Sequence, residues 1–280
     1  MTPVPAQPFF LAGPAGDLFA LYHPPAAPHP ARRDVIILPP FAEEMNKSRR
    51  MLALQARALT VLGYGVLLFD FYGTGDSHGD FGQATMDIWR GDLRAALAWL
   101  RQQGAERISL LALRFGALFA SDFAHTTGAS LDAAVLWQPV ISGEGMMTQF
   151  LRLRVAAGIT GSNTDKESTQ ELRARLAQGE AIEVAGYTLA PALVTAIDAM
   201  RINASQALGS APLRWWDLAP EAGRALSPAS QRVTEEWRHR GVDIQASVVA
   251  GEPFWSTPEI TLAPDLLQAT TAFFRERAAA

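Results

Sequence analysis

The hydrophobic positions of this chain follow two alternating patterns. Four short runs are apolar almost throughout, which is typical of strands buried on both faces of a parallel sheet. Longer stretches between them repeat apolar residues at helical spacing. In chain order this predicts strands at 34–38, 65–70, 107–112 and 133–137, with helices at 47–62, 84–102 and 116–127. Strand and helix alternate through short loops, so we predict a right-handed, mostly parallel, doubly wound α/β sheet.

The two ends of the chain extend this pattern, and the middle interrupts it. Residues 9–25 predict a hairpin of two short strands around a Gly-Pro-Ala-Gly turn. The alternation resumes late in the chain, with strands at 213–217 and 244–249 and helices at 228–240 and 265–278. Between these parts, residues 141–210 show only helical periods and no strand pattern. We therefore predict a core domain of residues 1–140 and 211–280, with residues 141–210 inserted as a helical cap.

Composition restricts the classes of function. The chain has 280 residues, of which 49% are hydrophobic and 19% are charged, as is usual for one large globular α/β domain. Its formal net charge of −4 gives no electrostatic reason to expect nucleic acid or anionic lipid as a partner. The absence of cysteine excludes disulfides, thiolate metal sites and cysteine nucleophiles. A small-molecule ligand is thus the expected partner.

Several targeting and cofactor signals are missing. The opening decapeptide lacks the basic and apolar regions of a signal peptide, and no run of 18 apolar residues occurs. We therefore expect a cytoplasmic protein without a membrane-spanning segment. No H-x-x-x-H pattern, carboxylate–histidine cluster or P-loop is present, so we predict neither a metal nor a cofactor.

The junction after the third predicted central strand carries the most informative residue. In α/β-hydrolases a strand runs into a helix through the nucleophile elbow, G-x-S-x-G, whose strained turn presents the catalytic serine. Here the corresponding residues are Ala112-Leu113-Arg114-Phe115-Gly116. Arg114 stands where the serine would be, and a guanidinium is a permanent cation without a nucleophilic lone pair. The scaffold indicates a hydrolase, whereas this residue argues against serine catalysis.

A second loop, at 39–51, is expected beside the elbow. In α/β-hydrolases this loop supplies one backbone N–H of the oxyanion hole, which Phe41 or Ala42 is placed to do here, and Phe115 offers the second. Glu43 and Glu44 follow directly. They either complement the dipole at a helix amino terminus, or at least one of them faces a ligand.

Arg114 itself needs an anionic partner if it is buried. Glu43, Glu44 and Asp76 are the candidates for a structural ion pair, and an anion clamp at the floor of a pocket is the functional alternative. These two interpretations are compatible. We predict a direct salt bridge from Arg114 to Glu43 or Glu44 at about 2.7–3.0 Å.

The remaining loops carry weaker signals. The loop at 70–82 shapes a turn, so its adjacent Ser77 and His78 are expected to be structural. Asp217 ends the predicted strand 213–217, about where a triad acid would stand, although an aspartate there is also a common turn residue. The loop at 250–260 should hold the general-base histidine and holds none. Its Phe254 and Trp255 instead indicate a pocket wall or core.

Taken together, these segments resemble one family, the exosortase A system-associated hydrolases of the second type within the α/β-hydrolase superfamily. The resemblance rests on PPFAEEMNKSRRM, DFYGTGDSHGDF, LALRFGA, WQPVISG with TQFLRLR, and the Phe-Trp pair after the last strand. It implies an α/β-hydrolase fold and a setting of exopolysaccharide production and protein sorting in Gram-negative bacteria. The nucleophile and the histidine of the general superfamily pattern are missing from this sequence, so its triad is degenerate. It supplies no substrate.

Two functions of different class remain open. The first is a hydrolase or acyl-transfer enzyme, in which Glu43 or Glu44 acts as general base, Arg114 binds a carboxylate or phosphate, and the N–H groups of Phe41 and Phe115 hold an oxyanion. Asp217 is a further candidate for a catalytic acid. The second is a non-catalytic protein whose pocket binds an anionic or acyl ligand, or a partner. Phe41, Ala42, Glu44, Arg114, Phe115 and Trp255 are the expected binding residues in both.

Overall fold

The computed structural model describes residues 4–27, 31–128, 130–160, 167–202 and 211–279. The strands of its large sheet are β1 (Gln7–Ala12), β2 (Asp17–His23), β3 (Arg33–Leu38), β4 (Gly65–Phe69), β5 (Arg107–Leu113), β6 (Ala134–Trp137), β9 (Leu213–Ala219) and β10 (Ile244–Ala250). They lie in the order β1-β2-β4-β3-β5-β6-β9-β10. β1 pairs with β2 and β2 with β4 in antiparallel fashion, and every other pair is parallel. The predicted mostly parallel sheet is confirmed.

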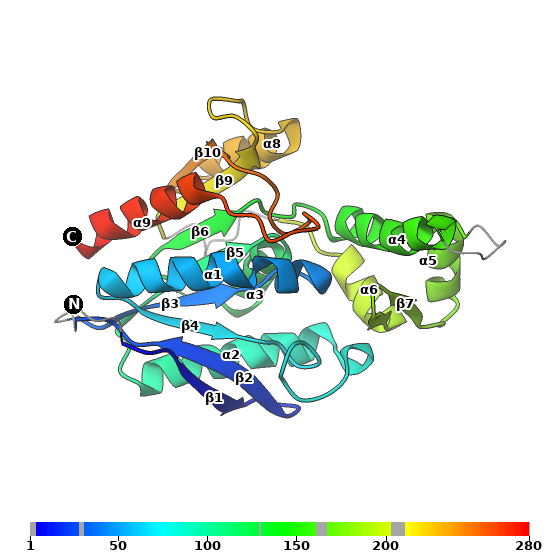
Figure 1. The fold of residues 1–280 in the computed structure, drawn as a ribbon, viewed down its shortest axis with the longest axis horizontal. Coiled ribbons are helices and arrows are strands. Elements are labelled where there is room, and N and C mark those ends of the chain that lie inside the picture. Colours follow the sequence, from blue (N-terminus) through cyan, green and yellow to red (C-terminus); the bar gives the residue numbers. More distant parts are fainter. Residues whose placement is uncertain (1–3, 28–30, 129, 161–166, 203–210, 280) are drawn as a thin grey trace.

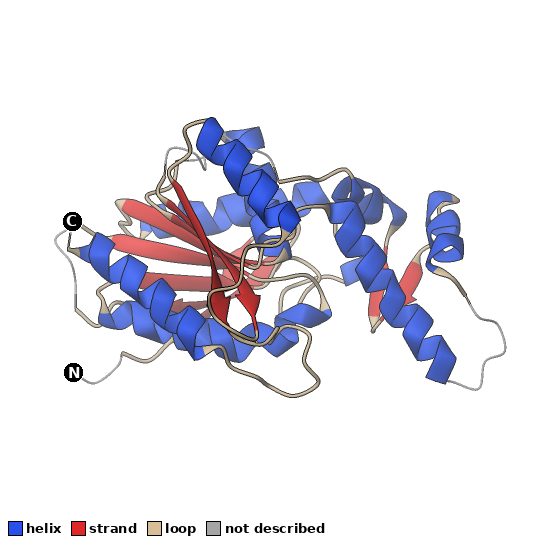
Figure 2. Ribbon diagram, turned by 90° about the horizontal axis from the view of Figure 1, so that it is seen from above, coloured by secondary structure: helices blue, strands red, loops and turns tan. Residues whose placement is uncertain are grey.

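Helices cover both faces of this sheet (Figures 1 and 2). They are α1 (Glu43–Val61) and α9 (Pro264–Ala278) on one face, and α2 (Met86–Gln102), α3 (Phe115–Thr127) and α8 (Pro228–His239) on the other. Two hydrophobic clusters, one on each side of the sheet, account for this layering. Alternate residues of β3 show the division, because Ile36 and Leu38 belong to one cluster while Val35 and Ile37 belong to the other.

The loops that follow the parallel strands leave the sheet along one edge, where these strands end. β3 and β5 pair in parallel with Leu38 opposite Ala112, so the loops that follow them leave the sheet side by side. A short 3-10 helix, η1 (Phe81–Gln83), lies in the loop between β4 and α2. In an open α/β sheet this edge is where ligands bind.

The segment between β6 and β9 lies beyond this edge (Figure 1). It contains α4 (Gly143–Thr160), α5 (Thr169–Ala177), β7 (Ile182–Val184), β8 (Tyr187–Leu189) and α6 (Pro191–Asp198). Its apolar side chains, Phe150 among them, join the cluster on the α2 and α3 face of the sheet. Residues 161–166 and 203–210, which we included in the predicted cap, lie outside the described residues.

The expectation that residues 141–210 contain no strand is wrong. β7 and β8 form an antiparallel hairpin in which Ile182 pairs with Leu189 and Val184 with Tyr187. Ala185 and Gly186 have φ values of 51° and 83°, the left-handed backbone that a tight two-residue hairpin turn requires. Buried and exposed residues alternate along β7, which is a strand pattern too short to outweigh the helical periods around it.

Candidate functional site

The turn from β5 into α3 keeps the strained backbone of a nucleophile elbow. Arg114 has φ 54° and ψ −115°, a conformation that costs a non-glycine residue about 1–3 kcal/mol. Three backbone hydrogen bonds hold it: its N–H donates to the carbonyl of Trp137 at 2.9 Å, and its own carbonyl accepts from the N–H groups of Ala117 at 3.1 Å and Val140 at 3.2 Å. The elbow geometry is therefore present with arginine in the position of the nucleophile.

Gly116 explains how the elbow can sit so close to the neighbouring strand. A Cβ on Gly116 would lie 2.6 Å from the carbonyl oxygen of Leu38 and 2.7 Å from that of Pro39, closer than such atoms can approach. The glycine therefore allows the first turn of α3 to pack against the end of β3. This contact places Arg114 beside the loop that carries the two glutamates.

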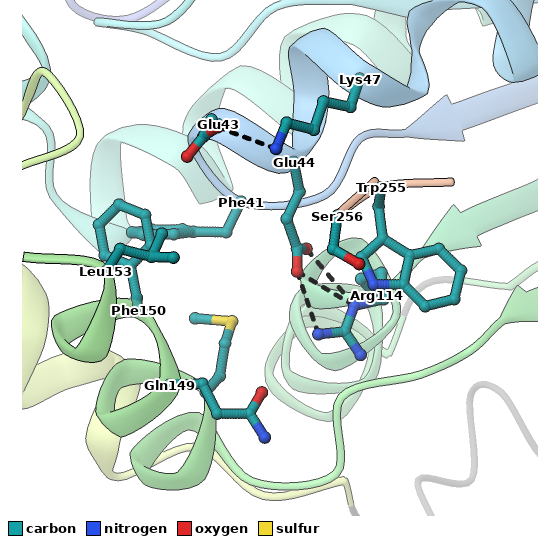
Figure 3. A pocket seen from close by; sticks show the side chains of 11 residues that line it. Phe41, Glu43, Glu44, Lys47, Arg114, Gln149, Phe150, Leu153, Trp255 and Ser256 are labelled. Carbon is teal, nitrogen blue, oxygen red and sulfur yellow. Dashed lines mark hydrogen bonds and ion pairs between the residues drawn. The ribbon is translucent and has the colours of Figure 1, made fainter. Parts of the chain in front are cut away.

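The predicted salt bridge exists, and its acid is Glu44. Nη2 of Arg114 lies 3.0 Å from Oε1 of Glu44, and Nε lies 3.3 and 3.4 Å from the two carboxylate oxygens. Figure 3 shows the two side chains pointing toward each other, Arg114 from the turn before α3 and Glu44 from α1. Glu43 instead pairs with Lys47 at 3.0 Å. The third candidate, Asp76, offers its N–H to Asp70 at 3.2 Å.

One interpretation of the glutamate pair, a helix amino terminus, is confirmed for their position. α1 begins at Glu43 rather than near residue 47, so Glu43 and Glu44 occupy its first turn, where carboxylates complement the helix dipole. Most of the segment that we expected to be a loop at 39–51 is therefore helix. The same two residues also line a pocket, and a ligand-facing role for either of them stays a prediction.

Burial raises the pKa of the Glu44 carboxyl above its ordinary value, although the nearby Arg114 guanidinium acts in the opposite direction. Its side chain remains 23% exposed and that of Arg114 remains 15% exposed. The guanidinium also stacks on Trp255, with Cζ 5.1 Å from the centre of the ring. Arg114 is therefore held between a carboxylate and an aromatic face.

A pocket of about 270 Å³ opens at this place between the sheet edge and α4. Figure 3 shows the side chains around it. It is lined by Phe41, Glu43, Glu44, Lys47, Arg114, Met146, Gln149, Phe150, Leu153, Trp255 and Ser256. Apolar walls with a few converging polar groups are what a small-molecule site requires.

The pocket brings together four of the six predicted binding residues, namely Phe41, Glu44, Arg114 and Trp255. The side chains of Ala42 and Phe115 are not in its lining. Both are buried, and the Phe115 ring packs edge-on against that of Phe41 at 5.4 Å. Ala42 and Phe115 could act only through their backbone N–H groups, which stand at the starts of α1 and α3, where helices lack internal acceptors.

Asp217 does not end its strand as we predicted. β9 continues to Ala219, so Asp217 is inside the strand rather than at its end. One carboxylate oxygen accepts from the indole N–H of Trp215 at 2.8 Å, and the other has no partner among the described residues. Asp217 is 4% exposed and is absent from the pocket lining, and a role for it as a catalytic acid stays a prediction.

Two other sequence interpretations can be compared with the structure. Ser77 is structural as expected, because its hydroxyl donates to the carbonyl of Asp70 at 2.6 Å and accepts from the N–H of Phe19 at 2.9 Å. Of the aromatic pair after β10, Phe254 is fully buried in the core, whereas Trp255 lines the pocket. Each of the two alternatives for this pair thus applies to one residue.

Sequence reasoning missed the contribution of α4 to the pocket. Met146, Gln149, Phe150 and Leu153 lie on one side of this helix at spacings of three and four residues.

The lining contains no histidine, and its Ser256 donates its hydroxyl to the carbonyl of Pro253 at 3.1 Å. Within the described part of the chain, no three potential ligating residues gather to hold a metal. No described helix has the length and apolarity to cross a membrane.

An eight-stranded doubly wound sheet with a strained elbow after its fifth strand defines the α/β-hydrolase fold. The sequence model of the serine aminopeptidase S33 family matches residues 29–199, which is more than half of the chain. The chain therefore belongs to this family of α/β hydrolases. A search of curated proteins finds no match.

Solved structures share the fold over the full length. One is Est1E from Butyrivibrio proteoclasticus with bound ferulic acid, which is 15% identical, with a TM-score of 0.68 and coverage of 97% of this chain and 100% of that one. A thermostable carboxyl esterase from Bacillus coagulans, in complex with glycerol, is 14% identical with a TM-score of 0.67, covering 98% and 99%. XC6422 from Xanthomonas campestris, described as an α/β serine hydrolase without a lid, is 16% identical with a TM-score of 0.58, covering 100% and 98%. At these identities the likeness establishes the fold alone.

Proposed function

We propose that this protein binds a small acyl ligand in the Arg114 pocket and does not hydrolyse it by the serine mechanism. The observation that carries the proposal is the elbow itself: its strained backbone is retained, yet it presents a guanidinium into a pocket with apolar walls. Strained backbone of this kind persists only where the surrounding structure holds it, and it is common at functional sites. Here it directs a hydrogen-bond donor toward the polar end of a ligand.

The lining supports an acyl ligand on two grounds. Phe41, Met146, Phe150 and Leu153 form an apolar wall suited to a hydrocarbon chain. Arg114 and Gln149 supply hydrogen-bond donors for a polar or anionic head group. Serine hydrolysis would further require an activated hydroxyl beside a base, and the lining offers no histidine to act as one.

A second candidate is a hydrolase or acyl-transfer enzyme in which Glu44 is the general base. The raised pKa of Glu44 favours it, because a base whose pKa lies nearer neutrality is better matched to proton transfer. The N–H groups at the starts of α1 and α3 would then hold the oxyanion. If this candidate is right, the wild-type protein hydrolyses an ester and Glu44→Gln abolishes that activity. If our first proposal is right, the wild-type protein itself does not hydrolyse the ester.

The assignment of the chain to a branch of the family, to a compartment and to two domains is also part of the proposal. We place the chain in the exosortase A system-associated branch of the family, second type, in the cytoplasm of an exopolysaccharide-producing bacterium. We retain the division into a core of residues 1–140 and 211–280 and a cap of residues 141–210. The arginine elbow and the FAEEMNKSRR segment support this branch.

Native mass spectrometry on protein purified from its own host tests the proposal. We expect the wild-type protein to carry a small molecule that denaturation releases. Gln149 is exposed and lines the pocket, so Gln149→Trp should fill the space without disturbing the core and should reduce the bound fraction. Equal loading of both proteins, or no bound molecule in either, would contradict binding at this site.

A further inference from the structure

The N-terminal hairpin leaves part of the sheet uncovered. Phe10 of β1 pairs with Phe19 of β2, and Leu21 of β2 pairs with Leu68 of β4. These four side chains lie on one face of the sheet, which we call the hairpin face, because paired residues and alternate residues of a strand point the same way. Phe10, Phe19 and Leu21 belong to neither of the two hydrophobic clusters described above. Figure 1 shows β1 and β2 with α2 behind them and no described helix in front of them.

A second pocket, of about 170 Å³, opens between the hairpin face and α1. Three residues of the hairpin face line it, together with Ala53 and other residues of α1. Apart from Arg49 and Asp70, which pair with each other at 3.1 Å, every residue of the lining is apolar. Apolar cavities of about 150 Å³ lined by Leu, Ile and Phe take up benzene. The second pocket is therefore of the size and polarity that one phenyl ring requires.

A phenyl ring lies beside this pocket and is exposed to solvent. Phe10 is 64% exposed, and no other Phe, Tyr or Trp among the described residues is exposed. Its ring centre lies 5.9 Å from that of Phe19, whose side chain lines the second pocket. An exposed ring and a pocket of matching size on one face are the two halves of a self-complementary contact, in which each of two copies supplies both halves.

We propose that the hairpin face joins two copies of this chain, and that Phe10 of each copy inserts into the second pocket of the other. A two-fold axis between Phe10 and the second pocket forms the same contact twice. Addition of a strand at the free edge of β1 is a less favourable way to join two copies, because Pro8 has no N–H to donate. The inference goes beyond the proposed function, since the second pocket shares no lining residue with the Arg114 pocket.

The size of the hairpin face agrees with a dimer that dissociates at micromolar concentrations. The length of β1 makes it roughly 20 Å long, and three strands together with α1 make it roughly 25 Å wide. Contact over this area buries roughly 1,000 Å² of surface in total, which is at the lower limit for a specific interface. Each Phe10 contributes roughly 100 Å² of apolar surface, so the loss of one ring should weaken dimerisation roughly 50-fold.

Sedimentation velocity over a range from about 1 to about 200 μM protein tests the proposal. The wild-type protein should be dimeric at the upper end of this range. Phe10→Ser removes both inserted rings and should be monomeric throughout. Ile260→Ser is the matched control, because Ile260 is 63% exposed but belongs to the loop between β10 and α9, and this variant should dimerise like the wild type. Ala53→Phe fills the second pocket from α1 and should be monomeric as well.

Mixing two variants distinguishes insertion of the ring from a general hydrophobic association. Phe10→Ser keeps an open pocket and has no ring, whereas Ala53→Phe keeps the ring and has a filled pocket. One of the two contacts can then form only between unlike copies. At about 200 μM of each variant, the mixture should contain a dimer that neither variant forms alone. Far-ultraviolet circular dichroism checks that each variant is folded, and Ala53→Leu takes the place of Ala53→Phe if the larger side chain prevents folding.

Each of the other outcomes overturns the proposal. A wild-type protein that remains monomeric at the highest concentration shows that two copies do not join. A dimer that persists in Phe10→Ser, or that is lost in Ile260→Ser, shows that the contact is not made by the hairpin face. A mixture of folded variants that forms no dimer shows that Phe10 does not insert into the second pocket.

Discussion

Replacing Arg114 by methionine should destabilise the fold through the carboxylate left behind. The Arg114–Glu44 pair at 3.0 Å places the charge centres about 4 Å apart, which corresponds to about 4 kcal/mol of attraction at an effective dielectric constant of 20. Desolvation of Glu44 offsets part of this attraction. We expect Arg114→Met to cost about 2–3 kcal/mol, below the 3–5 kcal/mol typical of fully buried pairs, because the two side chains are 15% and 23% exposed.

A double-mutant cycle measures the interaction itself. Glu44→Gln keeps an oxygen that accepts from Arg114 and should cost about 1 kcal/mol. The double variant should be no less stable than Arg114→Met alone, which gives a coupling energy of about 1–3 kcal/mol. Urea denaturation followed by far-ultraviolet circular dichroism gives these differences in the free energy of unfolding, provided that the m values agree.

The pH dependence of Arg114→Met gives a second check. Without the guanidinium, the pKa of Glu44 in the folded protein rises further above its value in the unfolded chain. As the pH falls, Glu44 is therefore protonated in the folded variant before it is protonated in the unfolded chain. The free energy of unfolding of the variant should increase as the pH falls from 7 to 5. Two results would refute the reasoning. The first is a double variant whose loss of stability equals the sum of the two single losses within about 0.5 kcal/mol, and the second is a loss in Arg114→Met that does not depend on pH.

Three further predictions concern the fold and the chemistry. Burial raises the pKa of the fully buried Asp92 to about 6, so the wild-type protein should lose stability as the pH rises from about 4 to about 6. Over this range the free energy of unfolding of Asp92→Asn should increase by up to about 3 kcal/mol relative to that of the wild type, as urea denaturation at each pH can show. An equal difference at both pH values would contradict this. Gly116→Ala should lower stability by about 1–3 kcal/mol through contact with the Leu38 and Pro39 carbonyls, whereas Gly145→Ala, whose Cβ would lie 3.8 Å from Ser142, should not, as thermal unfolding can show. A fluorophosphonate probe should label neither the wild-type protein nor Arg114→Ser, because no histidine lines the pocket; labelling lost on Ser256→Ala would refute this.

The layered fold was predictable because its signals are local and agree with one another. Each central strand is a continuous apolar run, and the helices between them repeat at 3.6 residues, so periodicity alone determined the order of elements. The Arg114–Glu44 pair was predictable for a related reason. The residues follow neighbouring parallel strands, and the pairing of Leu38 with Ala112 brings the two strand ends together.

The hairpin at residues 182–189 was missed although its signal was present. Ile182 and Val184 are buried around an exposed Glu183, and Ala185-Gly186 forms the turn. Strands of three residues give too few alternations to stand out between helices. The predicted strand end at Asp217 was wrong for a different reason, because β9 runs two residues past it and sequence patterns locate element ends poorly.

The pocket residues of α4 could not have been found by sequence reasoning. Met146, Phe150 and Leu153 are apolar residues at helical spacing, which normally indicates a side that packs against a core. Only the placement of α4 beyond the sheet edge turns part of that side toward Arg114. That placement depends on tertiary contacts, such as the packing of Phe150 against Phe41 at 5.2 Å, that no local pattern encodes.

A crystal structure of the protein grown with glycerol monohexanoate, an uncharged acyl ester, tests the central claim most directly. We predict an intact ester in the pocket, with its carbonyl oxygen accepting from the guanidinium of Arg114 and its chain against Phe41 and Phe150. Cleaved hexanoate in the pocket, or an ester bound elsewhere with Arg114 uninvolved, would contradict the account.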